Sequence, residues 1–197
     1  MDQKYWVLIV FWVAYFTIHS FAASSRLKRN LENRGISKNN YRKLYVILST
    51  AGLLAILLYS STFSESYLIE PNNFTKFVSL MLAAFGTIIL RLAFKQYNLR
   101  GFLGLMDENQ SKELQIRGIL AYIRHPIYSG TILIIVGYLL YIPKLSSLIV
   151  AVCVFIYLVI GIYLEERKLI TEFGQRYLDY KRKVPAIIPK LKDISFF

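Results

Sequence analysis

The chain has 197 residues, of which 55% are hydrophobic, and a mean hydropathy of +0.43. Several apolar runs are longer than a soluble core of this size needs, so the composition indicates a polytopic membrane protein. The formal net charge of +12 is typical of cytoplasmic loops that meet anionic lipid, and no basic and aromatic module points to nucleic acid. The single cysteine, Cys153, allows no disulfide within the chain and suggests no metal cluster. We therefore expect membrane lipids, and neither nucleic acid nor a metal, among its partners.

The first apolar run covers residues 5–23, and positive charge follows it at residues 26–29. A cleaved signal peptide is the alternative, because FAAS at residues 21–24 loosely resembles a cleavage site. Charge after the run instead favours a membrane helix whose C-terminal end stays in the cytoplasm. His19 and Ser20 lie near that end. A polar pair inside a span either lines a substrate cavity or bonds to a neighbouring helix.

Four further apolar runs alternate with polar loops. Residues 24–43 form a basic loop with seven Lys or Arg, residues 64–73 carry two glutamates and no basic residue, and residues 95–126 form a long polar connector. This alternation predicts a single all-α domain, residues 1–197, with five spans, an outside N-terminus and a cytoplasmic C-terminus. The predicted spans are residues 5–23, 44–63, 74–94, 127–142 and 145–164, followed by a cytosolic segment over residues 165–197.

The most informative stretch is RGILAYIRHPIYSG, residues 117–130, in which the letters RHP lead directly into the fourth span. A proline at the first helical position wastes no hydrogen bond, and the free backbone N–H groups of that turn suit an anion. Glu165 and Glu166 are expected at the end of the fifth span. Because the helix dipole disfavours negative charge there, this position favours a functional role for at least one of them.

Topology brings these two motifs together. The fourth and fifth spans form an antiparallel hairpin about a short turn at residues 143–144. The chain runs roughly 15 residues from Tyr128 to the turn and roughly 20 from the turn to Glu165, a mismatch of about 7 Å at 1.5 Å per residue. His125 and Glu165 are therefore expected at the same membrane face. A zwitterionic cofactor suits such a pair of anion-binding and cation-binding groups.

The segment after the fifth span contains an aromatic stripe. Phe173, Tyr177, Tyr180 and Val184 recur at the spacing of one helix face. An amphipathic helix with this stripe either rests on the headgroups or closes over a cofactor, and the two roles are compatible. Pro185 ends the predicted helix at the residue before it.

Within residues 112–189, RGILAYIRHPIYSG followed by LEERKLITEFGQRYLDYKRKVPAIIP resembles the isoprenylcysteine carboxyl methyltransferase-like family of integral membrane methyltransferases, which includes phospholipid methyltransferases. The N-terminal part resembles bacterial NnrU-type membrane proteins. The first resemblance implies S-adenosylmethionine (SAM) as methyl donor, held at the cytosolic side of the last two helices under the C-terminal segment. It also implies a lipophilic acceptor that enters from the membrane.

The resemblance implies a set of cofactor-binding residues by matching motifs: Leu114, Gln115, His125, Pro126, Ile127, Tyr128 and Glu165. We add Glu166 and Tyr177 to this predicted cofactor site. The candidate catalytic residues are Arg124, which suits the SAM carboxylate, Glu165, which suits its ammonium or a ribose hydroxyl, and His125. His125 is expected to position the ligand, with a general base as the alternative role.

Two positions depart from the family pattern. Gly161 stands where the eukaryotic enzymes carry an arginine implicated in substrate binding, and it leaves room in the acceptor site. Leu120 stands where the family has a tyrosine, two residues after the glycine that matches Gly118. Isoprenylcysteine is therefore not the expected acceptor, and a thiol, carboxylate or amine stays open. Two other functions stay open as well: an NADPH-dependent membrane reductase of the sterol type, which shares an RHPxY region, and a non-enzymatic membrane accessory protein.

Overall fold

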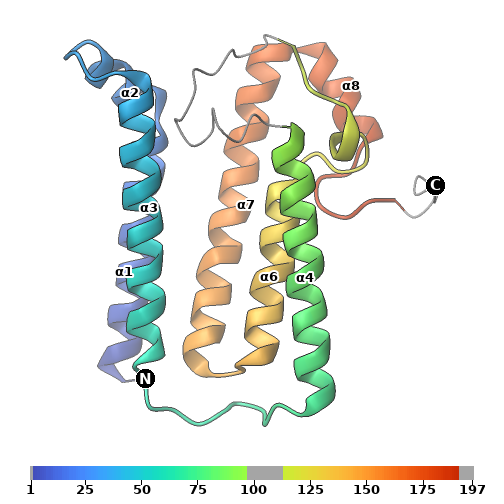
Figure 1. The fold of residues 1–197 in the computed structure, drawn as a ribbon. Coiled ribbons are helices and arrows are strands. Elements are labelled where there is room, and N and C mark those ends of the chain that lie inside the picture. The colour runs from blue at the N-terminus through green and yellow to red at the C-terminus, as the bar shows by residue number, and fades with distance from the viewer. Residues whose placement is uncertain (1, 97–112, 191–197) are drawn as a thin grey trace. The chain divides into compact units, whose positions relative to one another are not determined.

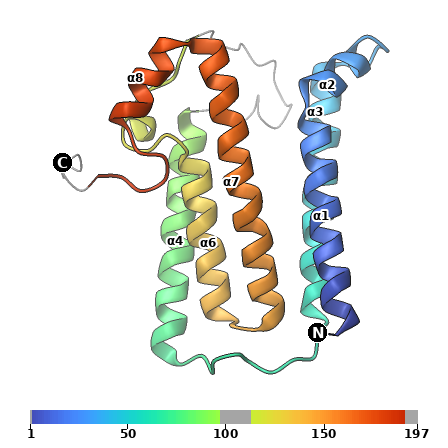
Figure 2. The same cartoon turned by 180° about the vertical axis from the view of Figure 1, so that it is seen from behind.

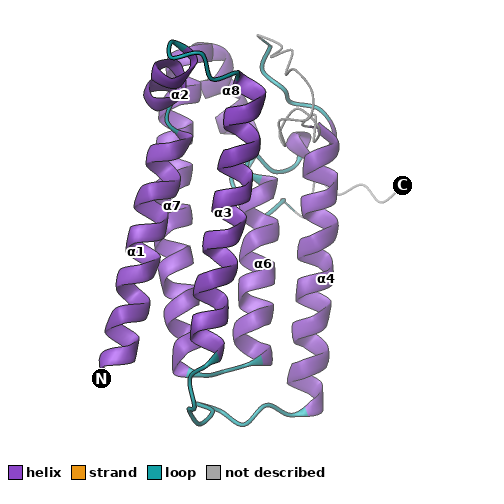
Figure 3. Ribbon diagram, turned by 60° about the vertical axis from the view of Figure 1, so that its left-hand side comes forward, coloured by secondary structure: helices purple, strands orange, loops and turns teal. Residues whose placement is uncertain are grey.

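The computed structural model describes residues 2–96 and 113–190, and within these ranges every regular element is helical (Figure 3). In chain order the elements are α1 (Gln3–Ala23), α2 (Ser25–Glu32), α3 (Lys38–Ser61), α4 (Asn73–Gln96), the 3-10 helix η1 (Gly118–Ala121), α6 (Pro126–Tyr141), α7 (Leu145–Phe173) and α8 (Gln175–Lys183). By length and composition α1, α3, α4 and α7 can each cross a membrane, whereas α6 is a shorter apolar helix. The all-α fold class is confirmed, and the fifth span stays a prediction.

The prediction of a loop over residues 24–43 is wrong, because α2 occupies part of it and α3 begins at Lys38. Two serines explain the difference. The hydroxyls of Ser24 and Ser37 each accept the backbone N–H three residues further on, at 3.4 and 3.2 Å. Serine is a favoured residue before the first turn of a helix. The polar residues that predicted a loop therefore include the caps of two helices.

The predicted end of the fifth span at residue 164 is not the end of the helix, because α7 continues to Phe173. The following residues EERKL form helices readily, so the helix outlasts its apolar run. Glu165 and Glu166 therefore lie well before the last turn, and the dipole penalty predicted for them does not apply. Gly174, with a φ of 55°, then separates α7 from α8, so the predicted aromatic stripe is divided between two helices.

The described residues form two compact units, and the first contains residues 2–69 and 144–153. In this unit α1 packs against α3 and buries Tyr5, Leu8 and Trp12 along one face. Glu65, in the loop after α3, accepts hydrogen bonds from the Tyr5 hydroxyl at 2.9 Å and from the backbone N–H of Ser146 at 3.3 Å. One carboxylate thus ties the beginnings of α1 and α7 to this loop. The single domain over residues 1–197 stays a prediction.

The second unit contains residues 70–96, 113–143 and 154–190, and within it α4 and α6 lie side by side (Figures 1 and 2). Their contact is a seam of small residues spaced seven apart: Ser79, Gly86 and Ala93 on α4, and Gly130 and Gly137 on α6. A Cβ on Gly86 would lie 2.6 Å from the Gly130 carbonyl oxygen, and one on Gly130 would lie 2.7 Å from that of Gly86. The glycines let the two backbones touch, and this contact holds α6 against α4.

Candidate functional site

His125 and the two glutamates of α7 meet where α6 begins. The His125 Nδ1 atom lies 3.6 Å from Glu165 Oε2, and its Nε2 atom lies 3.2 Å from Glu166 Oε1. The side chain of His125 is buried, whereas Glu165 is 41% exposed. The predicted proximity of His125 and Glu165 is therefore confirmed, and both ring nitrogens face a carboxylate.

Glu166 links three segments of the chain. Its carboxylate accepts hydrogen bonds from Arg124 Nε at 3.1 Å and Arg124 Nη2 at 2.5 Å, and from Lys181 Nζ, on α8, at 2.5 Å. Only 8% of Glu166 is exposed, and a buried carboxylate needs such partners to stay charged. Lys181 was not predicted as a site residue. We call Arg124, His125, Glu165, Glu166 and Lys181 the charged cluster.

Residues 184–187, here called the C-terminal strap, lie across the start of α6. Carbonyl groups of the strap accept the backbone N–H groups of Arg124 and His125 at 2.9 and 3.0 Å, and the Ser129 hydroxyl at 2.7 Å. The Arg124 guanidinium also donates to the carbonyl of Val184. The VPxxIP pattern therefore has a structural reason, since it supplies backbone acceptors to the RHP turn.

The remaining residues of the HPxY motif lie in the first turn of α6, as the proline predicts, and their cofactor-binding role stays a prediction. Pro126 is buried at the first position of α6, and Ile127 and Tyr128 are half-buried. The Tyr128 ring stands perpendicular to that of His125, with centroids 5.5 Å apart. A Cβ on Gly161 would lie 3.0 Å from the Tyr128 hydroxyl oxygen. The expectation that Gly161 leaves room for an acceptor is therefore wrong, because Tyr128 fills that space.

The segment before α6 contains Gly118, at a φ of 59°. A Cβ there would lie 1.9 Å from Nε2 of Gln96, a residue at the end of α4 that was not predicted to belong to the site. The backbone conformation therefore favours glycine here, whereas the Gln96 amide lies at the end of a flexible side chain that can move aside. Leu114 is half-buried and Gln115 is exposed, just before η1. Their cofactor-binding role stays a prediction.

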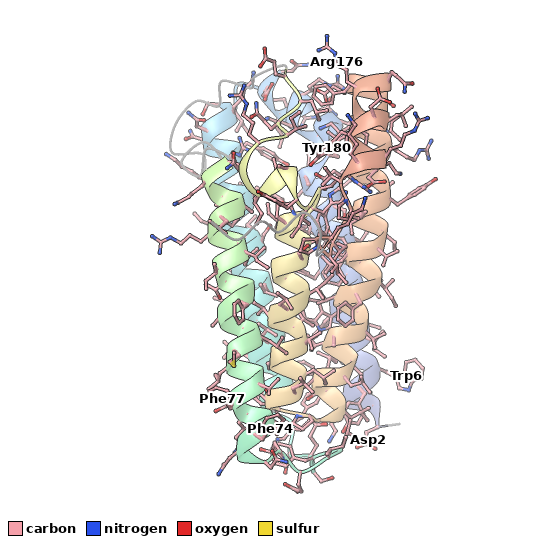
Figure 4. All side chains as sticks on the ribbon, turned by 90° about the vertical axis from the view of Figure 1, so that its right-hand side faces the viewer. Asp2, Trp6, Phe74, Phe77, Arg176 and Tyr180 are labelled. Carbon is pink, nitrogen blue, oxygen red and sulfur yellow. The ribbon has the colours of Figure 1, made fainter. Side chains whose placement is uncertain are left out.

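Two tyrosines of α8 face the same region. The Tyr180 hydroxyl donates to the carbonyl of Leu120 at 2.6 Å, whereas Arg176 points away from the protein (Figure 4). Tyr177 is 1% exposed, and its hydroxyl has no hydrogen-bond partner among the described residues. Burial, helped by the negative charge of Glu166 and opposed by the Arg124 guanidinium, raises the pKa of Tyr177 to about 12. A neutral hydroxyl is therefore held close to Arg124 and Glu166.

A second group of polar side chains borders a pocket of about 380 Å³ in the first unit. The His19 Nε2 atom lies 2.9 Å from the Tyr45 hydroxyl, and Nδ1 lies 3.1 Å from Ser49 Oγ. His19 thus bonds to α3, which was one of its two expected roles, and it also lines a cavity; that the cavity holds a substrate stays a prediction. Ser20 is not among the residues that line the pocket.

These elements define an all-helical membrane protein with a buried charged cluster at the start of a short apolar helix. Within the described ranges no group of three or more His, Cys, Asp or Glu side chains comes together to hold a metal ion. The family model described as NnrU protein matches residues 7–191, and the chain belongs to this family. The NnrU resemblance predicted for the N-terminal part therefore covers nearly the whole chain.

Two curated relatives carry the name of an enzyme. Methanethiol S-methyltransferase of Crocosphaera subtropica is 26% identical over 179 residues, which cover 87% of this chain and 69% of the relative. Methanethiol S-methyltransferase 1 of Bradyrhizobium diazoefficiens is 27% identical over 187 residues, which cover 90% and 64%. This chain thus spans about two thirds of the length of each relative. No solved structure matches the chain. The predicted resemblance to integral membrane methyltransferases is confirmed.

Proposed function

We propose that this protein is an integral membrane methyltransferase that uses SAM and acts on a small lipophilic acceptor. The observation that carries the proposal is the meeting of the HPxY turn with Glu165 of α7. It joins the start of a helix to a half-exposed carboxylate, and the buried Tyr177 hydroxyl lies close enough to feel the charges of Arg124, Glu165 and Glu166. The names of the two relatives support the same reaction class and favour it over a reductase.

The donor groups on this surface fit SAM. The first N–H groups of a helix have no partner within it, and no side chain caps the start of α6, so we propose that the backbone N–H of Ile127 donates to a carboxylate. Glu165 offers an acceptor to an ammonium or a ribose hydroxyl, and Tyr177 offers a buried hydroxyl. When bound, SAM supplies an electrophilic methyl group on a sulfonium.

For Arg124 and Glu166 we propose a role other than the one predicted from the sequence. The Arg124 guanidinium is occupied by Glu166 and by carbonyl groups of Lys181 and Val184. A ligand carboxylate would have to displace these bonds. We therefore propose that Arg124 and Glu166 are positioning residues, which hold the RHP turn and the C-terminal strap against α7.

His125 is best suited to positioning as well. Both of its ring nitrogens face carboxylates, which leaves neither directed at an acceptor. Methyl transfer between aligned atoms needs mainly orientation and exclusion of water, and a dedicated base is needed only when the acceptor must lose a proton to react. We propose that His125 holds Glu165 in place for the cofactor.

A thiol is the best-supported acceptor class. Both relatives are named for methanethiol, a thiol that is itself small and apolar. Thiols are largely neutral near pH 7 and enter a bilayer easily, whereas the thiolate is the nucleophile. The thiol would lose its proton to water where the cofactor site meets solvent, and the thiolate would then take the methyl group as the C–S bond of the sulfonium breaks and the demethylated thioether leaves. We propose further that α6 completes five spans, that the N-terminus lies outside, and that the cofactor site and an amphipathic α8 lie on the cytoplasmic side.

Calorimetry and turnover together test this function. The purified chain in detergent is expected to bind SAM in the micromolar range and to transfer a labelled methyl group to methanethiol or a short alkanethiol. Glu165→Gln should weaken SAM binding at least about tenfold, because it removes a charged acceptor. Glu172→Gln, on the exposed surface of the same helix, is the matched control and should leave binding unchanged.

Three outcomes would count against the proposal. Normal SAM binding by the Glu165→Gln variant would remove Glu165 from the site. Displacement of SAM by NADPH would favour the reductase. Tight SAM binding without turnover of any thiol, carboxylate or amine would favour an accessory protein.

A further inference from the structure

The pocket of the first unit is lined by uncharged side chains. We call it the α1–α3 pocket, and it is lined by four residues of α1, one of α2 and six of α3. None of these described lining residues is Lys, Arg, Asp or Glu. Its polar side chains His19, Tyr45 and Ser49 are already bonded to one another. Such a wall accepts an apolar group and would penalise an ionic one.

The pocket opens along the sides of the helices. Ile18 and Leu48 both line it, yet they are 68% and 61% exposed. In a membrane-spanning helix an exposed apolar side chain faces hydrocarbon. A ligand that reaches this pocket sideways therefore comes from the bilayer and carries a hydrocarbon chain.

Positive charge gathers at one end of the pocket. Leu27 of α2 lines it, and Arg26 and Lys28 flank Leu27 in the chain. The surrounding residues 24–43 contain seven basic residues and a single acidic one, Glu32. Basic clusters beside a membrane helix attract anionic headgroups. The pocket and its end thus match an amphiphile with an anionic head and an apolar tail.

We propose that the α1–α3 pocket binds one acyl chain of an anionic phospholipid, whose phosphate lies on the basic residues of α2. The pocket volume of about 380 Å³ falls in the range of small-molecule sites, about 300–1,000 Å³. A zwitterionic phospholipid brings the same chains without net charge, so it binds this site more weakly. The site is separate from the charged cluster, and its existence does not depend on the methyl-transfer proposal.

Native mass spectrometry of the full chain, titrated with phosphatidylglycerol or phosphatidylcholine of identical acyl chains, tests the proposal. Phosphatidylglycerol is expected to bind at least about tenfold more tightly at low salt, and the difference should shrink as salt rises. Substituting Arg26, Lys28 and Arg29 together by Gln should abolish the preference. Binding of free oleate as tightly as phosphatidylglycerol would overturn a phospholipid as the ligand.

Pocket-filling variants separate this site from the general lipid shell. Ala22→Phe fills the pocket from α1 and should remove the tight binding, whereas Ala23→Phe changes the next, exposed residue, which does not line it. Leu44→Trp fills the pocket from α3, with Ile47→Trp as its control. Thermal unfolding shows which variants fold. Tight binding unchanged in a folded filled variant, or equal affinity for the two lipids, would overturn the proposal.

Discussion

The two histidines of this chain lie in contrasting surroundings. His125 is buried between two carboxylates, in a cluster with an arginine and a lysine that come from segments far apart in the sequence. His19 lies among hydroxyl groups of the neighbouring helix α3. Loss of one residue from the charged cluster leaves a buried ion without its partner. Loss of one residue from the group His19, Tyr45 and Ser49, here called the neutral cluster, removes only a hydrogen bond between uncharged groups. Stability and ligand binding should therefore be coupled at His125 and separable at His19.

The largest expected effect is on stability and comes from Arg124→Ala. It leaves Glu166 buried with part of its charge unpaired, which should cost about 3–5 kcal/mol. Tyr45→Phe removes one neutral hydrogen bond beside His19 and should cost about 1 kcal/mol. Chemical unfolding in detergent measures both, and Arg176→Ala on the outer side of α8 is the control. Equal losses in the two regions would remove the contrast between them.

The second prediction concerns SAM binding. His125→Gln should weaken it at least about tenfold, because the amide cannot face both carboxylates as the ring does. His19→Gln should leave SAM affinity within about twofold, since it alters only the neutral cluster. Isothermal calorimetry of the two variants makes the comparison direct. A similar loss in both would show that the two regions act on one ligand.

Alkaline pH should sharpen the contrast. Because the folded-state pKa of Tyr177 is raised from 10.0 to about 12, its contribution to stability is full below pH 10 and is lost as pH rises through 12. At pH 11 this loss amounts to roughly 1 kcal/mol for the wild-type protein. Tyr177→Phe should remove that part of the pH dependence and, because the hydroxyl makes no hydrogen bond of good geometry and only approaches Arg124, change stability near pH 7 by about 1 kcal/mol or less.

The Tyr177→Phe variant also reports on the cofactor. If the Tyr177 hydroxyl forms a hydrogen bond to bound SAM, the variant combines unchanged stability with weaker SAM binding at pH 7. A matched fall in both quantities would instead mean that Tyr177 only supports the fold. Thermal unfolding and calorimetry on the same preparation separate these outcomes.

The smallest effect is expected for Lys181→Gln. The Lys181 side chain is 41% exposed, and ion pairs open to solvent contribute about 1 kcal/mol or less. Glu166 keeps Arg124 as its partner in this variant. A loss as large as that of Arg124→Ala, measured by the same unfolding experiment, would show that α8 closes the charged cluster rather than merely adding to it.

Sequence reasoning was most successful where local chemistry or chain length decides the structure. The proline at position 126 marks the first residue of α6, and the hairpin length places His125 beside Glu165. Span positions follow because apolar runs of membrane length have few alternatives. The ends of helices were harder to predict from the sequence. Ser24 and Ser37 cap the starts of two helices inside a segment whose composition is typical of a loop.

The partners of the charged residues could not be predicted. Arg124 could pair with a ligand carboxylate as well as with a carboxylate of the protein. Its partner is Glu166 because α7 packs against the RHP turn, and the sequence does not show this packing. The contact between Lys181 and Glu166 could not be predicted either, because Lys181 lies 15 residues after Glu166 and on a separate helix. Gln96 of α4 approaches Gly118 from far away in the sequence, and no periodic pattern predicts such a contact.

The C-terminal strap follows all the helices that the structure describes in chain order, so the order of synthesis governs when the start of α6 gains these acceptors. Its carbonyl groups reach Arg124, His125 and Ser129 only after the ribosome has passed residue 187. Until then the backbone N–H groups of the RHP turn lack these acceptors, although all the apolar helices are ready to insert. A chain released before residue 184 would thus lack these acceptors, and the start of α6 would keep unpaired backbone N–H groups.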